Sequence, residues 1–379
     1  MPMIQGFKIF DADAHVMMGP KMWQDLPKEY ATRRPRPLEI ADSAGAGIRR
    51  TGWLIEGRME PHAYGPGAQG ANTPTTVMPE FGAPTDSFGS LDLSEPEQRL
   101  RDLDALGIDS QLLFPSSLYA CMGSDPFFEA AMFRAYNRYA GRQCKASPKR
   151  LKWAGLLPLR DTGEALAALS EMQTLGASAA VVFGTVGERL LSHKSFTPIW
   201  DEFARGGLPL CVHMGRSYPP FDHLVETRLE AHVIAMGMPA QLGFVAIVAQ
   251  GMLDRYQDLK VAFLEFGAEW LFYVVGRLGH YLPSYRNDPT VRAMGRLPEK
   301  AIEEYLKSGR FFIAPEADDP LLLQEIALVG VEHVLFSSDY PHGEGRDNAA
   351  SEILQRGDLT DAQKRNILYH NTVRFCGEP

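Results

Sequence analysis

A single (β/α)₈ barrel, an α/β fold of the TIM type, is the architecture that the sequence predicts. Eight short apolar runs recur along the 379 residues, and amphipathic, helix-like stretches separate most of them. This alternation is typical of βα units around a parallel sheet, and eight such units complete one barrel. We therefore expect residues 1–379 to form one domain, with residues 35–97 as a long insertion after the first strand.

Each run is predicted as a strand because it is short, apolar and bounded by turn-forming or charged residues. The predicted strands are Phe7–Phe10, Ser110–Phe114, Leu151–Gly155, Ala179–Phe183, Pro209–His213, Lys260–Glu265, Arg310–Ala314 and His333–Ser337. The stretches between them carry apolar residues at helical spacing. The predicted helices are Glu164–Leu175, Phe196–Arg205, Gln241–Arg255, Pro320–Leu328 and Asp361–Cys376.

The insertion, residues 35–97, is rich in turn-forming residues, with 8 prolines and 9 glycines. Loops longer than about 15 residues in a compact domain are usually functional or disordered. We expect this segment to lie over the C-terminal mouth of the barrel as a lid or an oligomer contact. Its Gly65–Gly70 run matches the spacing of a dinucleotide-binding loop, but Pro66 lies inside it and no predicted strand precedes it, which favours an ordinary loop.

The composition excludes several classes of partner. The chain has 38 basic and 47 acidic side chains, a net charge of −9, and no long Lys/Arg run, so we expect no nucleic-acid partner. No apolar segment approaches about 20 residues and no signal-peptide pattern begins the chain, so we expect no membrane contact. Its four cysteines (Cys121, Cys144, Cys211 and Cys376) form no C-x-x-C pair, which favours reduced thiols and a cytoplasmic location.

The first strand region is followed by Asp11, Asp13 and His15 in the run Phe10-Asp-Ala-Asp-Ala-His15. Alternation along an extended chain places these three side chains on one side. Two carboxylates and an imidazole are costly to bury unpaired, and they are the donor set of a divalent metal site. Taken alone, the two acids also suit a strand exit at which they cap turns.

Further polar residues end other predicted strands. His213 ends the fifth strand, Glu265 ends the sixth, and Asp339 and His342 follow the eighth. In a (β/α)₈ barrel the carboxyl ends of all strands lie at one face, so these side chains should share one pocket with Asp13 and His15. Such oxygen and nitrogen donors suit Zn, Mn or Fe better than a pure Mg or Ca site.

These motifs resemble those of the amidohydrolase-related group within the amidohydrolase superfamily, which includes aminocarboxymuconate-semialdehyde and resorcylate decarboxylases. The resemblance covers nearly the whole chain outside the insertion and rests on Asp11–His15, Cys211–Gly215, Asp258–Glu265 and Ser338–His342. It implies a divalent metal ion bound by Asp13, His15, His213 and Asp339. It also implies a homo-oligomer.

The sequence departs from that family pattern at two positions. The first ligand is usually a histidine, and here it is Asp13; after the sixth strand the decarboxylases have a histidine, and here it is Glu265. Added carboxylates can bridge a second ion, as in relatives that look like dinuclear iron or manganese/iron oxygenases. Asp11, His232 and Glu265 are the further ligands that we expect in that case.

The same residues support three functions. The first is a metal-dependent hydrolase or decarboxylase that cleaves a C–N, C–O or C–C bond of a small carboxylate-bearing substrate, with zinc as a single ion. A zinc-like ion lowers the pKa of bound water from about 15.7 to about 7, Glu265 or Asp339 would act as general base, and His342 would stabilise an oxyanion. The alternatives are a dinuclear Fe or Mn/Fe oxygenase and a non-catalytic barrel with a binding role.

Four side chains near these motifs are predicted to contact the substrate: Arg216, Tyr218, Tyr340 and Trp270. An arginine can bind a carboxylate through two hydrogen bonds, which makes Arg216 the candidate anchor. A surface position is the alternative for the arginine, and aromatic packing is the alternative for the other three. The sequence contains no G-x-S-x-G elbow, P-loop or H-E-x-x-H motif, so a small-molecule substrate of a metalloenzyme remains the expectation.

Overall fold

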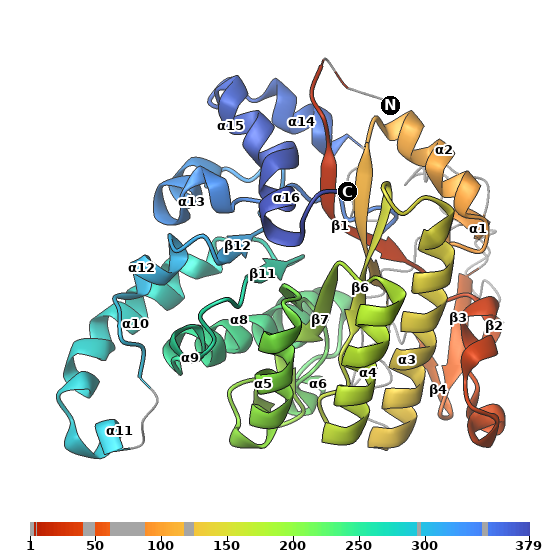
Figure 1. The fold of residues 1–379 in the computed structure, drawn as a ribbon, viewed down its shortest axis with the longest axis horizontal. Helices are drawn as coiled ribbons and strands as arrows, with labels where there is room; N and C mark the ends of the chain where they lie inside the picture. Colours follow the sequence, from red (N-terminus) through yellow and green to blue (C-terminus); the bar gives the residue numbers. More distant parts are fainter. Residues whose placement is uncertain are drawn as a thin grey trace.

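The computed structural model describes residue 4 and residues 6–40, 50–60, 88–116, 125–293, 297–342 and 348–379. Within these residues, seven parallel strands form one curled sheet in the order β1-β5-β6-β7-β10-β11-β12 (Figure 1). Their bounds are β1 Phe10–Val16, β5 Ser110–Pro115, β6 Leu151–Leu156, β7 Ala179–Phe183, β10 Leu210–His213, β11 Val261–Leu264 and β12 Phe311–Ile313. The spatial order follows the chain order, as the predicted barrel requires.

The barrel closes through the extended segment 334–340 rather than through a regular eighth strand. Single parallel bridges join Val334 to Ile313 of β12 and Tyr340 to Ala14 of β1. The predicted strand His333–Ser337 is therefore wrong as a regular element, although its segment occupies the expected place. A 3₁₀ turn immediately before Val334 and a left-handed residue at position 339 leave too few extended residues for a longer ladder.

The first strand also differs from its prediction. β1 begins at Phe10, whereas Phe7–Phe10 was expected, so the polar motif lies on the strand and does not follow it. All seven residues of β1 are buried, and its pairing with β5 is irregular between Asp11 and Ala14. This irregularity changes which side chains face the barrel mouth.

Helices cover the outer face of the sheet (Figure 1). The longer ones are α2 Pro96–Leu106, α3 Pro126–Gln143, α4 Thr162–Leu175, α5 Thr197–Gly206, α8 Met238–Phe244, α10 Trp270–Arg286, α13 Leu322–Val329 and α14 Ala349–Gln355. The shorter ones are α1 Phe88–Leu91, α6 Pro219–Asp222, α7 Arg228–Glu230, α9 Met252–Arg255, α11 Pro289–Ala293, α12 Ile302–Leu306, α15 Asp361–Arg365 and α16 Asn371–Cys376. The 3₁₀ and π turns are η1 Pro20–Asp25, η2 Lys28–Arg33, η5 Cys144–Ala146, η6 Lys194–Phe196, η7 Ala231–Gly237, η8 Val245–Ala249, η9 Val331–His333 and η10 Asn366–His370.

Local sequence explains where a helix such as α4 begins and ends. The side chain of Asp161 accepts a hydrogen bond from the Glu164 amide at 2.9 Å, which satisfies an otherwise unpaired N–H of the first turn. Gly176 ends the helix with φ of 80°, a left-handed conformation that costs glycine little. The helices predicted at Glu164–Leu175 and Phe196–Arg205 are confirmed to within about two residues.

Two other predicted helices are broken by π turns. The stretch Gln241–Arg255 divides into α8, η8 and α9, and Asp361–Cys376 divides into α15, η10 and α16. One continuous helical stretch, Ala231–Ala249, is long and apolar enough to cross a membrane, but 61% of its most apolar window is buried inside the protein. That burial is typical of a core helix, and this stretch packs against the barrel through α8.

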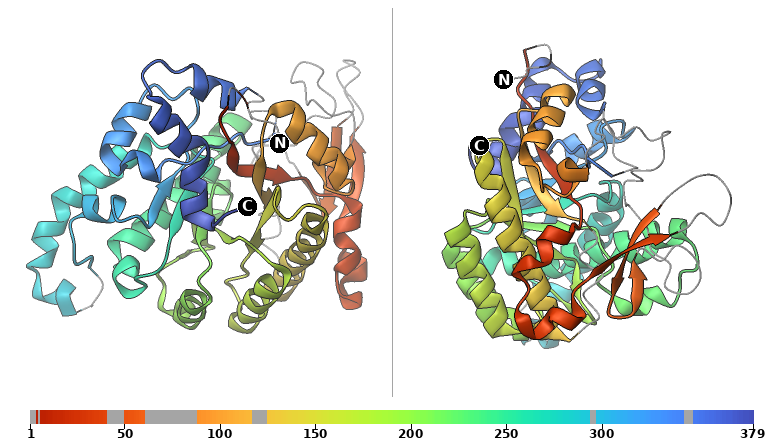
Figure 2. Two further views of the ribbon diagram at one scale, coloured as in Figure 1. Left: turned by 45° about the horizontal axis from the view of Figure 1, so that its top comes forward. Right: turned by 90° about the vertical axis from the view of Figure 1, so that its right-hand side faces the viewer.

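The insertion contains more secondary structure than its composition suggests. β2 Arg36–Ile40, β3 Arg50–Ile55 and β4 Arg58–Glu60 form a separate antiparallel sheet, which Figure 2 shows beside the barrel. The side chains of Trp53 and Ile55 are buried and join the main core, so this sheet is attached by apolar packing. Residues 41–49 and 61–87, including the Gly65–Gly70 run, lie outside the described residues, and the lid remains a prediction. Two smaller strands, β8 Thr185–Val186 and β9 Arg189–Leu190, form a hairpin after β7.

Candidate metal centre

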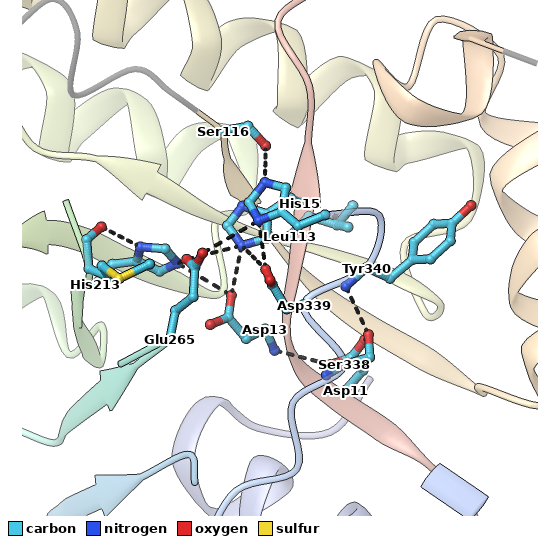
Figure 3. Close-up of polar contacts among 12 residues, drawn as sticks. Asp11, Asp13, His15, Leu113, Ser116, His213, Glu265, Ser338, Asp339 and Tyr340 are labelled. Atoms are coloured by element: carbon cyan, nitrogen blue, oxygen red, sulfur yellow. Dashed lines mark hydrogen bonds and ion pairs between the residues drawn. The ribbon is translucent and has the colours of Figure 1, made fainter. Parts of the chain in front are cut away.

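Six polar side chains meet at the carboxyl ends of the barrel strands (Figure 3). β1 supplies two of them, β10 supplies one at its end and β11 one just beyond its end. The last two come from the end of the segment that closes the barrel and from the turn that follows it. They are Asp13, His15, His213, Glu265, Asp339 and His342. The structure therefore brings together the six residues that the sequence placed in one pocket.

Ligand atoms in this cluster form two overlapping groups, each within 4.8 Å. The first group is Asp13, His15, His213 and Glu265, and the second is His15, Glu265, Asp339 and His342. The closest pairs are His213 Nε2 to Glu265 Oε2 at 2.7 Å and His342 Nδ1 to Asp339 Oδ1 at 2.7 Å. His15 Nε2 lies 3.0 Å from Asp339 Oδ1 and 3.4 Å from Glu265 Oε2, so His15 and Glu265 link the two groups.

Most of the nitrogen and oxygen atoms in this cluster that could bind a metal are buried. Among the described residues they lack a hydrogen bond of normal geometry. This holds for both carboxylate oxygens of Asp13, for Nε2 of His15 and His213, for Oδ1 of Asp339 and for Nδ1 of His342. An unsatisfied buried polar group costs roughly 1–3 kcal/mol, so a cluster of them requires a partner. Imidazole and carboxylate donors converging in this way fit a divalent metal ion.

Hydrogen bonds on the far side of two rings orient their free nitrogens. His213 Nδ1 lies 2.8 Å from the Met214 carbonyl oxygen and donates to it, which directs Nε2 toward the cluster. Ser116 Oγ lies 2.9 Å from His342 Nε2 and leaves Nδ1 of that ring facing Asp339. Ser116 was missed by the sequence reasoning, although its place directly after β5 is the same signal that identified the other strand-end residues.

The side chain of Asp11 points away from the cluster, which corrects its prediction as a ligand. Its Oδ2 accepts hydrogen bonds from Ser338 Oγ at 2.5 Å and Gln111 Nε2 at 2.9 Å. Simple alternation fails here because the register of β1 shifts between Asp11 and Ala14. Burial raises the pKa of the Asp11 carboxyl to about 7 despite these donors. Asp11 therefore ties β1 to the loop that carries Asp339.

Other predicted site residues lie elsewhere. Among the described side chains, His232 belongs to neither ligand group; it lies on the helical turn η7, and its role as a ligand stays a prediction. The hydroxyl of Tyr340 donates to Asp102 Oδ2 at 3.2 Å and its ring lies 4.5 Å from the Arg99 guanidinium, so it points away from the cluster (Figure 3). Trp270 stacks on Phe266 with centroids 5.2 Å apart. Both aromatic side chains therefore make packing contacts within the protein, and their contact with a substrate stays a prediction.

Two residues in the loop after β10 are also predicted to contact the substrate. Arg216 and Tyr218 are both half-buried in the loop that follows His213. The Tyr218 ring packs against Phe221 with centroids 4.8 Å apart. Their contact with a substrate therefore stays a prediction.

Opposite charges are held close together in the cluster. Burial alone would raise the pKa of the Glu265 carboxyl, but His213 and His15 hold that pKa well below its usual range. Burial alone would lower the pKa of His213, and Glu265 with Asp13 raises it well above its usual value. Protonated imidazoles thus supply the positive charge that a bound cation would otherwise provide, and cation binding would release those protons.

The backbone is strained at two of the six residues. Glu265 has φ of 69° and Asp339 has φ of 54°, a left-handed conformation that is uncommon for residues other than glycine. Such conformations cost about 1–3 kcal/mol each and persist where surrounding contacts over-determine them. At both strand ends the turn directs a carboxylate back over the mouth of the barrel.

A comparison with known proteins decides the family. A family model described as amidohydrolase matches residues 77–377, most of the chain. The chain belongs to the amidohydrolase family. The match includes His213, Glu265 and Asp339 of this amidohydrolase, whereas Asp13 and His15 precede it.

Characterised relatives of this amidohydrolase include decarboxylases. The chain is 22% identical over 286 residues to gamma-resorcylate decarboxylase of Polaromonas sp. (strain JS666 / ATCC BAA-500), which covers 73% of this chain and 85% of that protein. It is 28% identical over 227 residues to 6-methylsalicylic acid decarboxylase of Penicillium expansum, which covers 56% of this chain. The chain spans 64% of the length of that fungal relative.

Solved structures share the fold of this amidohydrolase. An amidohydrolase of Mycobacterium avium subsp. paratuberculosis K-10 has a TM-score of 0.76 at 18% identity, covering 98% of both chains. The 5-carboxyvanillate decarboxylase of Novosphingobium aromaticivorans, solved with bound manganese, has a TM-score of 0.69 at 18% identity, covering 98% of this chain and 97% of that one. These similarities confirm the predicted barrel architecture.

Proposed function

We propose that the protein is a metal-dependent decarboxylase that acts on a small carboxylate-bearing substrate. The observation that carries this proposal is the set of buried imidazole and carboxylate donors without hydrogen-bond partners among the described residues at the mouth of the barrel. Decarboxylase relatives within the same family support the reaction class. The substrates of those relatives set the chemistry to test first.

The proposed cofactor is a divalent ion of the manganese type. Asp13, His15 and His213, which share one ligand group, would hold it together with Asp339, whose Oδ1 lies 3.0 Å from His15 Nε2. When bound, such an ion supplies positive charge that can hold a substrate carboxylate and a neighbouring oxygen. Manganese rather than zinc is the ion named with relatives, including a dihydroxybenzoic acid decarboxylase of Polaromonas.

Glu265 is the residue that we assign to proton transfer. Decarboxylation breaks the bond between the substrate carbon and its carboxylate, leaves an electron pair on that carbon, and requires one proton in place of the departing carbon dioxide. The Glu265 carboxylate is 8% exposed, with Oε2 2.7 Å from His213 Nε2 and Oε1 3.4 Å from His342 Nδ1. It is therefore held between two imidazoles through which a proton can pass.

Arg216 and Tyr218 are the proposed substrate-contacting residues. Both follow His213 in the loop after β10 and both are half-buried, so they border the same strand end as the cluster. A guanidinium in this place would pair with a second acidic group of the substrate. The insertion 35–97 is the proposed lid, and a homo-oligomer is the proposed assembly.

Hydrolysis is a second candidate because Glu265 is a carboxylate. A carboxylate beside a metal centre can take a proton from attacking water, which is the role of a general base. The same residue thus supports cleavage of a C–N or C–O bond. The relatives described above are decarboxylases or amidohydrolases, so the dioxygen chemistry considered from the sequence gains no support from them.

Two measurements test the proposal. Elemental analysis of protein purified without added metal should find about one ion per chain, mainly manganese; two ions would assign one to each ligand group, and folded protein without metal would overturn the proposal. Substrates chemically related to dihydroxybenzoate, methylsalicylate and carboxyvanillate should release carbon dioxide and, in heavy water, gain one deuterium at the former carboxyl position. Incorporation of oxygen-18 from labelled water without release of carbon dioxide would instead establish hydrolysis.

A further inference from the structure

A second cluster of carboxylates lies outside the candidate metal centre. Glu269 precedes α10 in the loop after β11, Asp319 lies in the loop after β12, and Glu325 lies on α13. One carboxylate oxygen from each residue lies within 4.8 Å of the others. None of the three belongs to the six residues of the metal centre, so this cluster needs its own explanation.

Two carboxylates of the cluster are buried, and some of their oxygens have no hydrogen-bond partner in the described part of the chain. Glu325 is 0% exposed, and neither of its carboxylate oxygens has a hydrogen-bond partner among the described residues. Asp319 is 3% exposed; its Oδ1 accepts from the Leu321 amide at 2.6 Å, but its Oδ2 is buried and equally unpaired. A buried carboxylate with no donor beside a second carboxylate is strongly unfavourable, so the pair needs either a bound cation or a shared proton.

Arg356, whose positive charge acts on Glu325, makes its hydrogen bonds outside the three side chains of the cluster. Arg356 donates to the carbonyl oxygens of Ala317 at 3.3 Å and Asp319 at 2.9 Å, and it pairs with the Asp358 carboxylate at 2.8 Å. Its charge is therefore balanced by Asp358 rather than by the side chains of the cluster. The three carboxylates of the cluster retain an excess of negative charge.

We infer that Glu269, Asp319 and Glu325 form a binding site for a hard divalent cation of the calcium or magnesium class, separate from the metal centre. All the donors are oxygens, which suits these cations and contrasts with the histidine-rich metal centre. Glu269 is exposed, so the site opens to solvent on one side and water can complete the coordination. This inference does not depend on the proposed decarboxylation.

A cation at this position would join two loops that border the metal centre. The loop after β11 begins with Glu265 and contains Glu269, and the loop after β12 contains Asp319 and leads into α13. Calcium takes six to eight oxygen ligands, so an ion held by carboxylates of both loops would restrain the loops relative to one another. We therefore expect cation binding here to stabilise the protein against thermal unfolding.

The test uses the full chain with its metal centre loaded with manganese. Isothermal titration with calcium, and separately with magnesium, should reveal one further ion per chain, and bound terbium should emit when tryptophan is excited, because Trp270 follows Glu269 directly. Glu325→Gln and Glu269→Gln should each weaken binding by at least about tenfold. Glu269 is exposed, so the second variant is informative even where the buried substitution impairs folding.

Two controls separate this site from other carboxylates. Glu303→Gln, an exposed acid on α12, should bind as the wild type does, and Asp339→Ala should keep the terbium emission while it loses manganese. Without a cation, burial and the neighbouring Asp319 charge raise the pKa of Glu325 to about 8, which favours a proton shared between the two carboxylates. Absence of a further calcium or magnesium ion, or unchanged binding in both Gln variants, would overturn the inference.

Discussion

The imidazole rings of His15 and His342 stack with centroids 3.8 Å apart and planes inclined by 27°. Two protonated rings at this separation repel each other, so the stack persists only where negative charge faces both. Asp339 Oδ1 supplies it, at 3.0 Å from His15 Nε2 and 2.7 Å from His342 Nδ1. A bound cation would allow both rings to be neutral and would remove the repulsion. We therefore expect the stack to be more stable when the centre holds an ion.

Asp339→Ala tests the ligand assignment. Removal of this carboxylate leaves the two rings without their shared partner, so we expect loss of most of the bound metal, at least about tenfold in affinity. The far-ultraviolet circular dichroism should stay unchanged, because the closing segment of the barrel keeps its backbone contacts. Glu303→Ala, at an exposed helical position, is the matched control. Full metal content in the Asp339 variant would remove this residue from the ligand set.

Glu265→Gln tests proton transfer. The amide has nearly the same shape but cannot take up or release a proton in the same way, so the turnover number should fall by about 10²–10⁴. Bound metal, measured alongside, should be largely retained through Asp13, His15, His213 and Asp339. Wild-type turnover in this variant would show that another group transfers the proton.

Asp11→Ala tests positioning from behind the metal centre. The substitution leaves Ser338 Oγ and Gln111 Nε2 without their acceptor, and each unpaired buried group costs about 1–3 kcal/mol. We expect a lower free energy of unfolding in urea and metal affinity reduced by about 10–100-fold, because Ser338 precedes Asp339. Asp11→Asn retains an acceptor and should recover part of both losses. Equal damage in the two variants would contradict a role through this hydrogen bond.

His333 predicts an acid-sensitive contribution to stability away from the metal centre. Its Nε2 accepts from the Gly309 amide at 3.0 Å while Nδ1 donates to the Val329 carbonyl oxygen, so the folded ring is neutral. Burial lowers its pKa below the ordinary value of 6.5. Below pH 6.5 the unfolded chain therefore binds more protons than the native state, and stability falls as the pH drops from about 6.5 toward the lower native pKa.

The corresponding measurement is urea unfolding at several values of pH between about 7.5 and 5. Each unit by which the native pKa is lowered should contribute about 1.4 kcal/mol to the loss. His333→Gln, which cannot titrate, should lose less stability over this range than the wild type. Parallel losses in both proteins would assign the acid sensitivity to other groups.

Much of the fold could be predicted because its signals are local. Short apolar strands, helical spacing and caps such as Asp161 and Gly176 are encoded within a few neighbouring residues. The position of His213 at the end of β10 and of Glu265 just beyond β11 follows from the same local pattern. Because the carboxyl ends of barrel strands meet at one face, those local assignments were sufficient to bring the donors into one pocket.

The sequence by itself therefore predicted the barrel, the family resemblance and the grouping of six imidazole and carboxylate side chains at the mouth of the barrel. Only the tertiary structure decided that Asp11 turns from the cluster to Ser338, that Tyr340 packs against Arg99, and that Ser116 orients His342. These contacts join residues separated by as many as 327 positions. The register shift in β1 and the left-handed Asp339 lie beside these residues. Neither feature has a periodic signal in the sequence, because each arises from how distant segments meet.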